Sequence, residues 1–324
     1  MGAMTRRSAL LGAAGLAASF GSARAADYPA RPVRIIVPFA PGGPTDIMAR
    51  VMAAHLGERL GGSFIVENRP GAGGNIGAGV VAHAEPDGYT LLIHSSALVV
   101  NPGLYKQVPY DPYKDFAPIA ELGTSANVFL ADPKSGITSI ADLVTRAKKD
   151  PGTISYSSAG IGTTPHLSGE MLKLAAGIDL IHVPYPGGGP AMQAVLSSVT
   201  PVGCVSLPPA LSFIQSGGLI GLALTGRTRR KDLPNVPTMI ELGYKDFFTD
   251  TFQAFMAPAN TPPDIVALLA KTSIDILHDP QIFAQLEANG FEVLANGPAG
   301  MKKRIDDEVP KWAALIRKAG IKPV

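Results

Sequence analysis

The stretch that decides the fold is Arg34-Ile-Ile-Val-Pro-Phe-Ala-Pro-Gly-Gly-Pro-Thr-Asp-Ile-Met-Ala-Arg50. The β-branched run at 33–37 predicts a buried strand, and the prolines and glycines of 38–44 break both strand and helix. Thr45 is expected to cap a helix, because apolar residues follow it at helical spacing until Gly61 and Gly62 end the helix. The stretch therefore predicts a strand, a glycine turn and a helix whose first N–H groups are unpaired.

A helix start of this kind attracts anions, because its unpaired backbone donors and the positive end of its dipole point the same way. One such contact contributes about 0.3–2 kcal/mol, whereas micromolar binding needs about 8 kcal/mol. The alternative is that Gly42 and Gly43 only form a tight turn and bind nothing. A binding site therefore requires a second element that closes over the same ligand.

Length and composition narrow the class of protein. The 324 residues give room for two domains or one large one, and a hydrophobic content of 46% argues against disorder. Cys204 is the only cysteine, which excludes an intrachain disulfide and a cysteine-based zinc site.

Residues 1–25 have the features of a cleavable signal peptide. Arg6 and Arg7 supply the positive region, residues 9–20 an apolar run too short to span a bilayer, and residues 23–25 an Ala-x-Ala cleavage site. The segment is twin-arginine-like, and Sec export is the alternative. Cleavage would remove three arginines and no acids and lower the formal charge from +2 to −1, so the charge indicates neither nucleic acid nor an anionic membrane as partner. We expect a soluble, exported protein of the periplasm.

Strand and helix signals alternate along the remaining chain, which predicts a parallel sheet with helices on both faces. Residues 101–116 are expected to form a proline-interrupted crossing. The glycine-rich segment 71–77 fails the G-x-G-x-x-G dinucleotide fingerprint. Strands are expected at 64–67, 89–93, 128–131, 154–156, 219–225 and 251–257, and helices at 78–83, 140–149, 280–286 and 298–319 and after residues 166, 189 and 261.

Two later segments repeat the opening pattern of strand, glycine turn and helix. They lie at 154–166 and 181–190, far along the chain from the first. In open α/β sheets, ligands collect outside the carboxyl ends of the strands. Two lobes facing each other would place helix starts on both sides of one small anion, which supplies the second element that binding requires.

Five motifs in order resemble the periplasmic solute-binding proteins of tripartite tricarboxylate transporters, the Bug family, from about residue 27 to the C-terminus. They are Pro38-Phe-Ala-Pro-Gly-Gly-Pro-Thr-Asp46, Glu67-Asn-Arg-Pro-Gly-Ala-Gly-Gly-Asn-Ile-Gly77, Pro86-Asp-Gly-Tyr-Thr-Leu-Leu92, Tyr110-Asp-Pro with Asp115-Phe116, and Pro184-Tyr-Pro-Gly-Gly-Gly-Pro190. The resemblance implies an α/β, two-lobed Venus flytrap fold, each lobe a sheet flanked by helices. It also implies lobes of 27–125 plus 250–324 and of 126–249.

The resemblance further implies a carboxylate cradle in the first lobe, formed mostly by backbone N–H groups, and a facing loop in the second lobe. Ser95, at the carboxyl end of a predicted strand, completes the set. The candidate ligand-binding residues are Phe39, Gly42, Gly43, Thr45, Asp46, Ser95, Ser157, Ser158, Gly160, Thr163, Thr164, His166, Tyr185 and Gly188.

Two places depart from the family pattern. The stretch Ser197-Ser-Val-Thr-Pro-Val-Gly203 stands where glycines and an aspartate are usual, and Phe252 stands where a tryptophan is common near the hinge. Both could alter the choice of ligand. Neither conflicts with the fold.

No catalytic or metal-binding pattern competes with binding. G-x-S-x-G, H-E-x-x-H and G-x-x-x-x-G-K are absent from the sequence, and the six histidines lack metal-ligand spacing. We expect no enzyme, cofactor or metal, but a monomeric receptor that presents a mono- or dicarboxylate to the membrane subunits of a transporter. The alternatives are an exported hydrolase or isomerase, with His166 and Ser157 or Ser158 as base and nucleophile, and a ligand sensor for a signalling partner.

Overall fold

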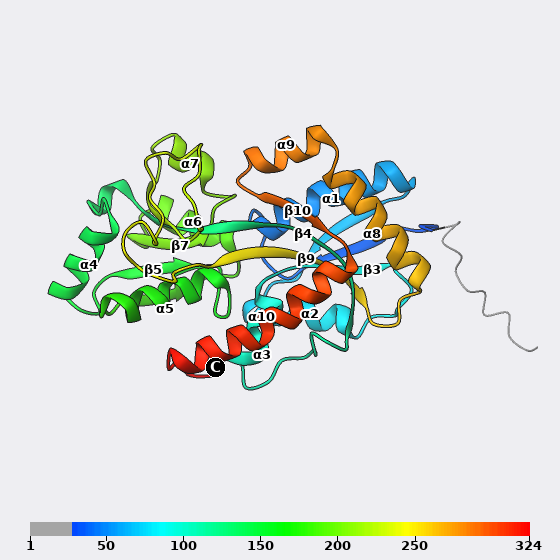
Figure 1. The fold of residues 1–324 in the computed structure, drawn as a ribbon, viewed down its shortest axis with the longest axis horizontal. Coiled ribbons are helices and arrows are strands. Elements are labelled where there is room, and N and C mark those ends of the chain that lie inside the picture. Colours follow the sequence, from blue (N-terminus) through cyan, green and yellow to red (C-terminus); the bar gives the residue numbers. More distant parts are fainter. Residues whose placement is uncertain (1–27) are drawn as a thin grey trace, which may run out of the picture.

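The computed structural model describes residues 28–324, and the signal segment expected at 1–25 lies outside the described residues. The chain forms two lobes, each a sheet flanked by helices (Figure 1). Two long strands, β4 (Phe116–Ala131) and β9 (Asp250–Pro258), lie at the centre of the molecule and pair over much of their length. No helix within 28–324 is long and apolar enough to cross a bilayer.

The first lobe contains a mixed sheet. Its strands β1 (Val33–Val37), β2 (Phe64–Asn68) and β3 (Thr90–Ser95) are parallel. β9 then pairs antiparallel with β3 and β4, and β10 (Glu292–Asn296) pairs antiparallel with β4. The sequence-based expectation of a wholly parallel sheet was therefore wrong.

The second lobe repeats this plan. β5 (Ser155–Ser158) pairs parallel with β6 (Ile181–Pro184) and with β7 (Val202–Ser206). The end of β4, Asn127 to Ala131, pairs antiparallel with β7 and with β8 (Ile220–Leu224). β4 therefore leaves the sheet of one lobe and enters that of the other.

Several helices begin at a residue other than the one that the sequence predicted. α1 is capped by Gly43 and has Thr45 inside its first turn, so Thr45 is not the N-cap. Pro262 rather than Thr261 precedes α8, and residues 101–116, expected to be a crossing, begin inside α3. The helices are α1 (Pro44–Leu60), α2 (Asn75–Ala82), α3 (Ala97–Leu104), α4 (Ile140–Lys149), α5 (Thr164–Ala176), α6 (Gly188–Leu196), α7 (Leu211–Gln215), α8 (Pro263–Leu277), α9 (Pro280–Ala288) and α10 (Pro298–Lys318).

Apolar burial anchors the helices that follow the glycine turns. α1 buries Met48, Met52 and Leu56 against the first sheet, and Gly61 ends the helix in the left-handed conformation that glycine adopts at little cost. In the second lobe α5 follows β5 through the turn at Gly160 and Gly162. α5 buries Leu167 and Leu172, so both glycine turns precede helices that are anchored in a core.

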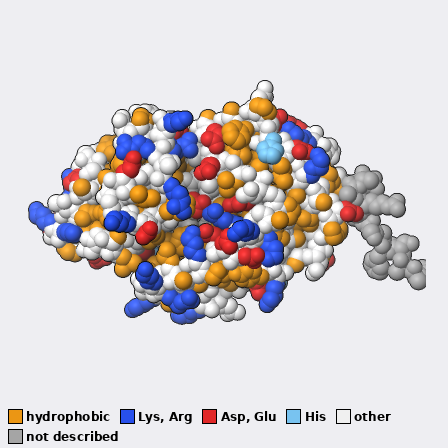
Figure 2. Space-filling view, in the orientation of Figure 1, with side chains coloured by type: hydrophobic (Ala, Val, Ile, Leu, Met, Phe, Trp, Pro, Cys, Tyr) orange, Lys and Arg blue, Asp and Glu red, His pale blue; other side chains and the backbone are white. Residues whose placement is uncertain are grey.

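Buried polar groups join the lobes where β4 crosses. Asn127 is fully buried, and its Oδ1 lies 3.1 Å from Ser206 Oγ and 2.8 Å from Thr251 Oγ1. Nearby, Asp250 accepts hydrogen bonds from Thr124 Oγ1 at 2.7 Å and from Arg304 Nη2 at 2.7 and 2.9 Å. On the face seen in Figure 2, acidic and basic side chains cluster in this middle part of the molecule, where the two lobes join.

Candidate functional site

Three helix starts meet at a small inner cavity between the lobes. α1 contributes Gly43 and Thr45, α5 contributes Thr163 and Thr164, and α6 contributes Gly188. The N–H groups of a first helical turn have no partner within their own helix, and the dipoles of the three helices favour negative charge at these ends. The arrangement supplies the opposed helix starts that the sequence predicted.

Hydroxyl groups complete the lining of the inner cavity. Thr164 Oγ1 lies 2.6 Å from Thr251 Oγ1, which in turn contacts the buried Asn127. The volume is about 20 Å³, enough for about one water molecule. A carboxyl group is larger, so its binding here requires a small separation of the lobes. The lining comprises Phe39, Gly43, Pro44, Thr45, Ser95, Ala159, Thr163, Thr164, Pro165, Gly188, Ser206 and Thr251.

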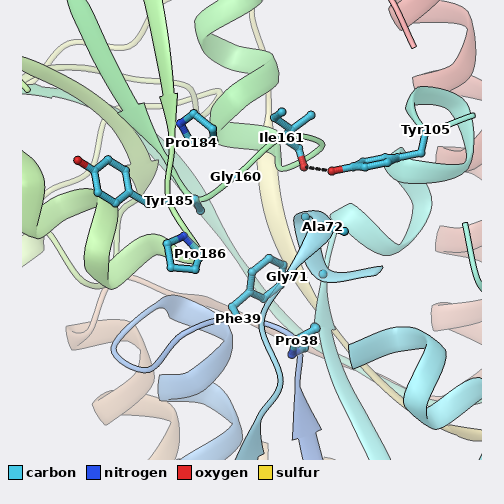
Figure 3. Close-up of a pocket in the computed structure, with 13 residues that line it drawn as sticks. Pro38, Phe39, Gly71, Ala72, Tyr105, Gly160, Ile161, Pro184, Tyr185 and Pro186 are labelled. Carbon is cyan, nitrogen blue, oxygen red and sulfur yellow. Dashed lines mark hydrogen bonds between the residues drawn. The ribbon is translucent and has the colours of Figure 1, made fainter. Parts of the chain in front are cut away.

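A larger outer cavity of about 290 Å³ adjoins the inner one, since Phe39 and Ala159 line both. Figure 3 shows Phe39 and Ala72 on one side of it and Gly160 and the backbone of Ile161 on the other, while the side chain of Ile161 and the ring of Tyr185 point away. Its side chains are mostly apolar. The lining comprises Pro38, Phe39, Gly71, Ala72, Gly73, Gly74, Tyr105, Ala159, Gly160, Ile161, Pro184, Tyr185 and Pro186.

The two lobes touch around both cavities. The backbone N–H of Ala40 donates to Pro186 O at 2.9 Å, and Tyr105 Oη donates to Ile161 O at 3.1 Å. A Cβ placed on Gly43 would lie 3.3 Å from the nitrogen of Gly188. The glycines at these positions therefore permit a closed arrangement that side chains would obstruct.

The structure brings most of the candidate residues to the two cavities. Phe39, Gly43, Thr45, Ser95, Thr163, Thr164 and Gly188 line the inner cavity, and Phe39, Gly160 and Tyr185 line the outer one. The remaining candidates, Gly42, Asp46, Ser157, Ser158 and His166, line neither cavity. Residues 197–203 and Phe252, where the sequence departs from the family pattern, line neither cavity either.

Asp46 is occupied within its own loop. Its carboxylate accepts hydrogen bonds from Arg50 at 2.9 Å, from the Gly42 N–H at 3.0 Å and from Asn68 Nδ2 at 2.9 Å. Burial opposes its ionisation, but these hydrogen bonds outweigh burial and hold the pKa of Asp46 below its ordinary value. Since Asn68 Nδ2 also donates to Phe39 O at 2.9 Å, Asp46 fixes the shape of the glycine turn.

Ser158 pairs with His182 rather than with His166. Ser158 Oγ lies 2.7 Å from His182 Nε2, and the rings of His166 and His182 lie 4.4 Å apart. Burial lowers the pKa of His166 to about 4 and that of His182 to about 3. Ser157 Oγ donates to Ala191 O at 2.9 Å. Both serines are fully buried and line neither cavity, so a ligand in the cleft does not reach this serine–histidine pair.

Sequence reasoning missed several residues that line the cavities. Ser206 and Thr251 stand at strand ends, with no local motif around them to mark them. The glycine turn at 71–74 and Tyr105 were also missed, although the turn belongs to one of the five motifs. The glycines at 71, 73 and 74 are the local signal for this turn. Among residues 28–324, no cluster of three His, Cys, Asp or Glu could hold a metal ion.

Comparison with known proteins decides the family. The model of the tripartite tricarboxylate transporter family receptor matches residues 48–321. The chain belongs to this receptor family. BugT of Bordetella pertussis (strain Tohama I) is 37% identical over 322 residues, which cover 98% of this chain and 99% of BugT.

Solved structures agree with this assignment of the receptor to the Bug proteins. The periplasmic binding protein BugD superposes with a TM-score of 0.89 at 38% identity, covering 92% of the receptor and 100% of BugD. An R. palustris protein solved with adipate gives a TM-score of 0.88 at 32% identity over 92% of the receptor and 100% of that chain. The family comprises binding receptors rather than enzymes.

Proposed function

We propose that the receptor captures a small carboxylate-bearing organic acid, mono- or dicarboxylate, in the interlobe cleft and delivers it to the membrane subunits of a tripartite tricarboxylate transporter. The observation that carries this proposal is the meeting of three helix starts at one cavity that no charged side chain lines. Backbone and hydroxyl donors suit a carboxylate, which only accepts hydrogen bonds. The R. palustris relative with adipate supports the same ligand class.

The proposal includes a hinge between the lobes. We place one lobe at 27–125 plus 250–324 and the other at 126–249, because the partner of β4 changes from β9 to β7 and β8 between Ala126 and Asn127. In the closed arrangement of the structure, Gly43 and Thr45 of the first lobe line the same cavity as Thr163, Thr164 and Gly188 of the second, and under this proposal the lobes separate to admit the acid. The receptor acts in the periplasm as a monomer under this proposal.

Thermal shift against a panel of organic acids tests capture. A ligand at 100 times its Kd stabilises the folded state by about 2.7 kcal/mol, which raises the melting temperature measurably. Thr45→Val removes a cradle hydroxyl and should weaken the best acid several-fold. Thr145→Val is the matched control, because Thr145 lies on α4 and donates to Ala141 O at an exposed site. No stabilisation by any acid would refute the proposal.

We propose binding without chemistry. The serine–histidine pair at Ser158 and His182 is sealed from both cavities, and this supports a receptor over a hydrolase. Incubation of the protein with its best ligand, followed by mass spectrometry of the recovered acid, should return the acid unchanged. Recovery of an altered product would favour the enzyme.

A further inference from the structure

A third cavity, of about 590 Å³, lies where the two lobes join, and we call it the hinge cavity. Under the proposed division of the chain, the second lobe contributes residues from the loop 226–230, which follows β8. The first lobe contributes Glu287 of α9, Glu292 and Leu294 of β10 and Arg304 of α10. Both lobes therefore bound the hinge cavity, as they bound the cleft, but with different elements.

The hinge cavity and the cleft lie on opposite sides of β4. In the first lobe β4 pairs with β9 along one edge and with β10 along the other, and in the second lobe it pairs with β7 along one edge and with β8 along the other. Ser206 of β7 and Thr251 of β9 share a 2.8 Å hydrogen bond and line the inner cavity, whereas the hinge cavity is lined from β10 and from the loop after β8. A rotation about the crossing strands that widens the cleft therefore narrows the hinge cavity.

Most charged side chains that line the hinge cavity already have a polar partner. Arg304 Nη2 lies 2.7 Å from Asp250 Oδ2, and Arg230 Nε lies 2.9 Å from Asp232 Oδ1. The carboxylate of Glu287 accepts a hydrogen bond from a backbone N–H of β10 at 3.3 Å. These groups are occupied in the closed arrangement and have little to gain when the cavity narrows.

Two charges of opposite sign remain, one on each lobe. Arg227 belongs to the second lobe, and its guanidinium carbon lies 4.1 Å from the ring centroid of Phe248. Glu292 belongs to the first lobe, at the start of β10. Both residues are exposed, and within residues 28–324 neither takes part in an ion pair. Narrowing of the hinge cavity would move these two charges toward one another.

We propose that Arg227 and Glu292 form an ion pair when the receptor opens, and that this pair holds the ligand-free receptor open. Closure around a ligand breaks the pair, so the pair lowers ligand affinity through the population of the closed conformation. An exposed ion pair is a weak interaction, but it suffices to shift an equilibrium between two conformations of similar free energy. The inference goes beyond the proposed function, because it assigns a role to the side of β4 away from the cleft, and it rests on the hinge proposed above.

Distances between two spin labels in the ligand-free protein test the inference. Cys204 is fully buried, so cysteines introduced at the exposed Ala54 of α1 and Gln193 of α6 can be labelled selectively. These two helices begin on opposite sides of the inner cavity. Arg227→Gln and Glu292→Gln should each lower the ratio of open to closed receptor about two- to fivefold, the effect of one exposed ion pair. The double variant should equal either single variant, because all three lack the same pair.

Arg31→Gln is the matched control for Arg227→Gln. The guanidinium carbon of Arg31 also lies 4.1 Å from an aromatic ring centroid, that of Tyr89, but Arg31 lines none of the three cavities, so its replacement should leave the label distances unchanged. Melting temperatures show whether each variant is folded. Unchanged distances in folded Arg227→Gln or Glu292→Gln, or effects that add in the double variant, would overturn the inference and leave ligand capture untouched. Failure of every organic acid to bind would instead refute the proposed function, while the label distances would still decide the inference.

Discussion

The backbone N–H of Ala40 donates a 2.9 Å hydrogen bond to the carbonyl oxygen of Pro186 and joins the glycine turns of the two lobes. Next to this bond the turns pack backbone to backbone, and a Cβ on Gly189 would lie 2.7 Å from Pro41 O. The Pro41 oxygen belongs to the backbone, so it cannot move away without moving the turn. The closed arrangement of the lobes thus depends on the absence of a side chain at Gly189.

Gly189→Ala should therefore favour an open receptor. The added methyl group collides with the opposite lobe, whereas within helix α6 alanine is favoured over glycine by about 0.5–1 kcal/mol. We expect ligand affinity to fall at least tenfold and the radius of gyration in small-angle scattering with ligand to increase, with no loss of melting temperature in the free protein. Gly218→Ala is the control, because its nearest neighbouring atom would lie 3.5 Å from the methyl group. Unchanged affinity in Gly189→Ala would contradict the role of this contact.

Asp46 should act on ligand binding by shaping the cradle. Asp46→Asn loses the charge that holds Arg50 and weakens the acceptor for the Gly42 N–H. Since a hydrogen bond to a charged group contributes about 1.5–3 kcal/mol, we expect the affinity for the best acid, measured by calorimetry, to fall about tenfold.

The control for Asp46 has the same local geometry at the surface. Asp142 pairs with Arg146 at 2.8 Å, four residues on, and accepts from the Thr138 N–H at 3.2 Å, four residues back. Asp142→Asn should cost similar stability and leave affinity unchanged. Equal losses of affinity in both variants would show that Asp46 has no special part in the cradle.

The helix starts could be predicted from the residues of the turns themselves. The rest of the site could not, because it depends on pairing between strands that are far apart in the sequence. The turn at Gly42 and Gly43 is encoded by its own glycines and prolines, so its place before α1 follows from the sequence. Ser206 and Thr251 reach the cavity only because β7 and β9 flank β4, pairings that join residues about 80 to 125 positions apart.

The differences between the sequence-based predictions and the structure also have specific physical causes. β4 contains Pro118 and Gly123 and pairs with irregular register near both, so the sequence predicted only its last four residues as a strand and the sheet as wholly parallel. The enzyme alternative took His166 as the base for Ser157 or Ser158. The parallel register of β5 and β6 instead sets Tyr156 opposite His182 and brings that ring to Ser158.

The ion pair between Asp250 and Arg304, where the two lobes join, should stabilise the fold. Asp250 is buried and contacts Arg304 and Thr124, so removal of Arg304 leaves its carboxylate without a cationic partner. Arg304 itself also lies 3.7 Å from Glu121 and 4.0 Å from Glu308. Asp250→Asn and Arg304→Met should each lower the free energy of unfolding in urea by about 3 kcal/mol. The double variant should lose less than the sum of the two single losses, because the interaction between the two side chains is lost in each single variant but only once in the double variant. Additive losses would mean that the two side chains act independently.

Buried histidines should make stability depend on pH between about 4 and 6.5. Burial holds the pKa of His94 at about 4 in the native state, while an unfolded histidine has a pKa near its ordinary 6.5. In that range the unfolded state binds more protons, so the free energy of unfolding is greatest above pH 6.5 and falls as the pH falls toward 4. From pH 7 to pH 5 one such histidine accounts for a loss of about 2 kcal/mol in the free energy of unfolding.

His94→Asn should reduce by that amount the loss of unfolding free energy measured in urea between pH 7 and 5. Between pH 7 and 8 the stability of both proteins should change equally. An identical loss in the variant between pH 7 and 5 would show that the native fold does not lower the pKa of His94.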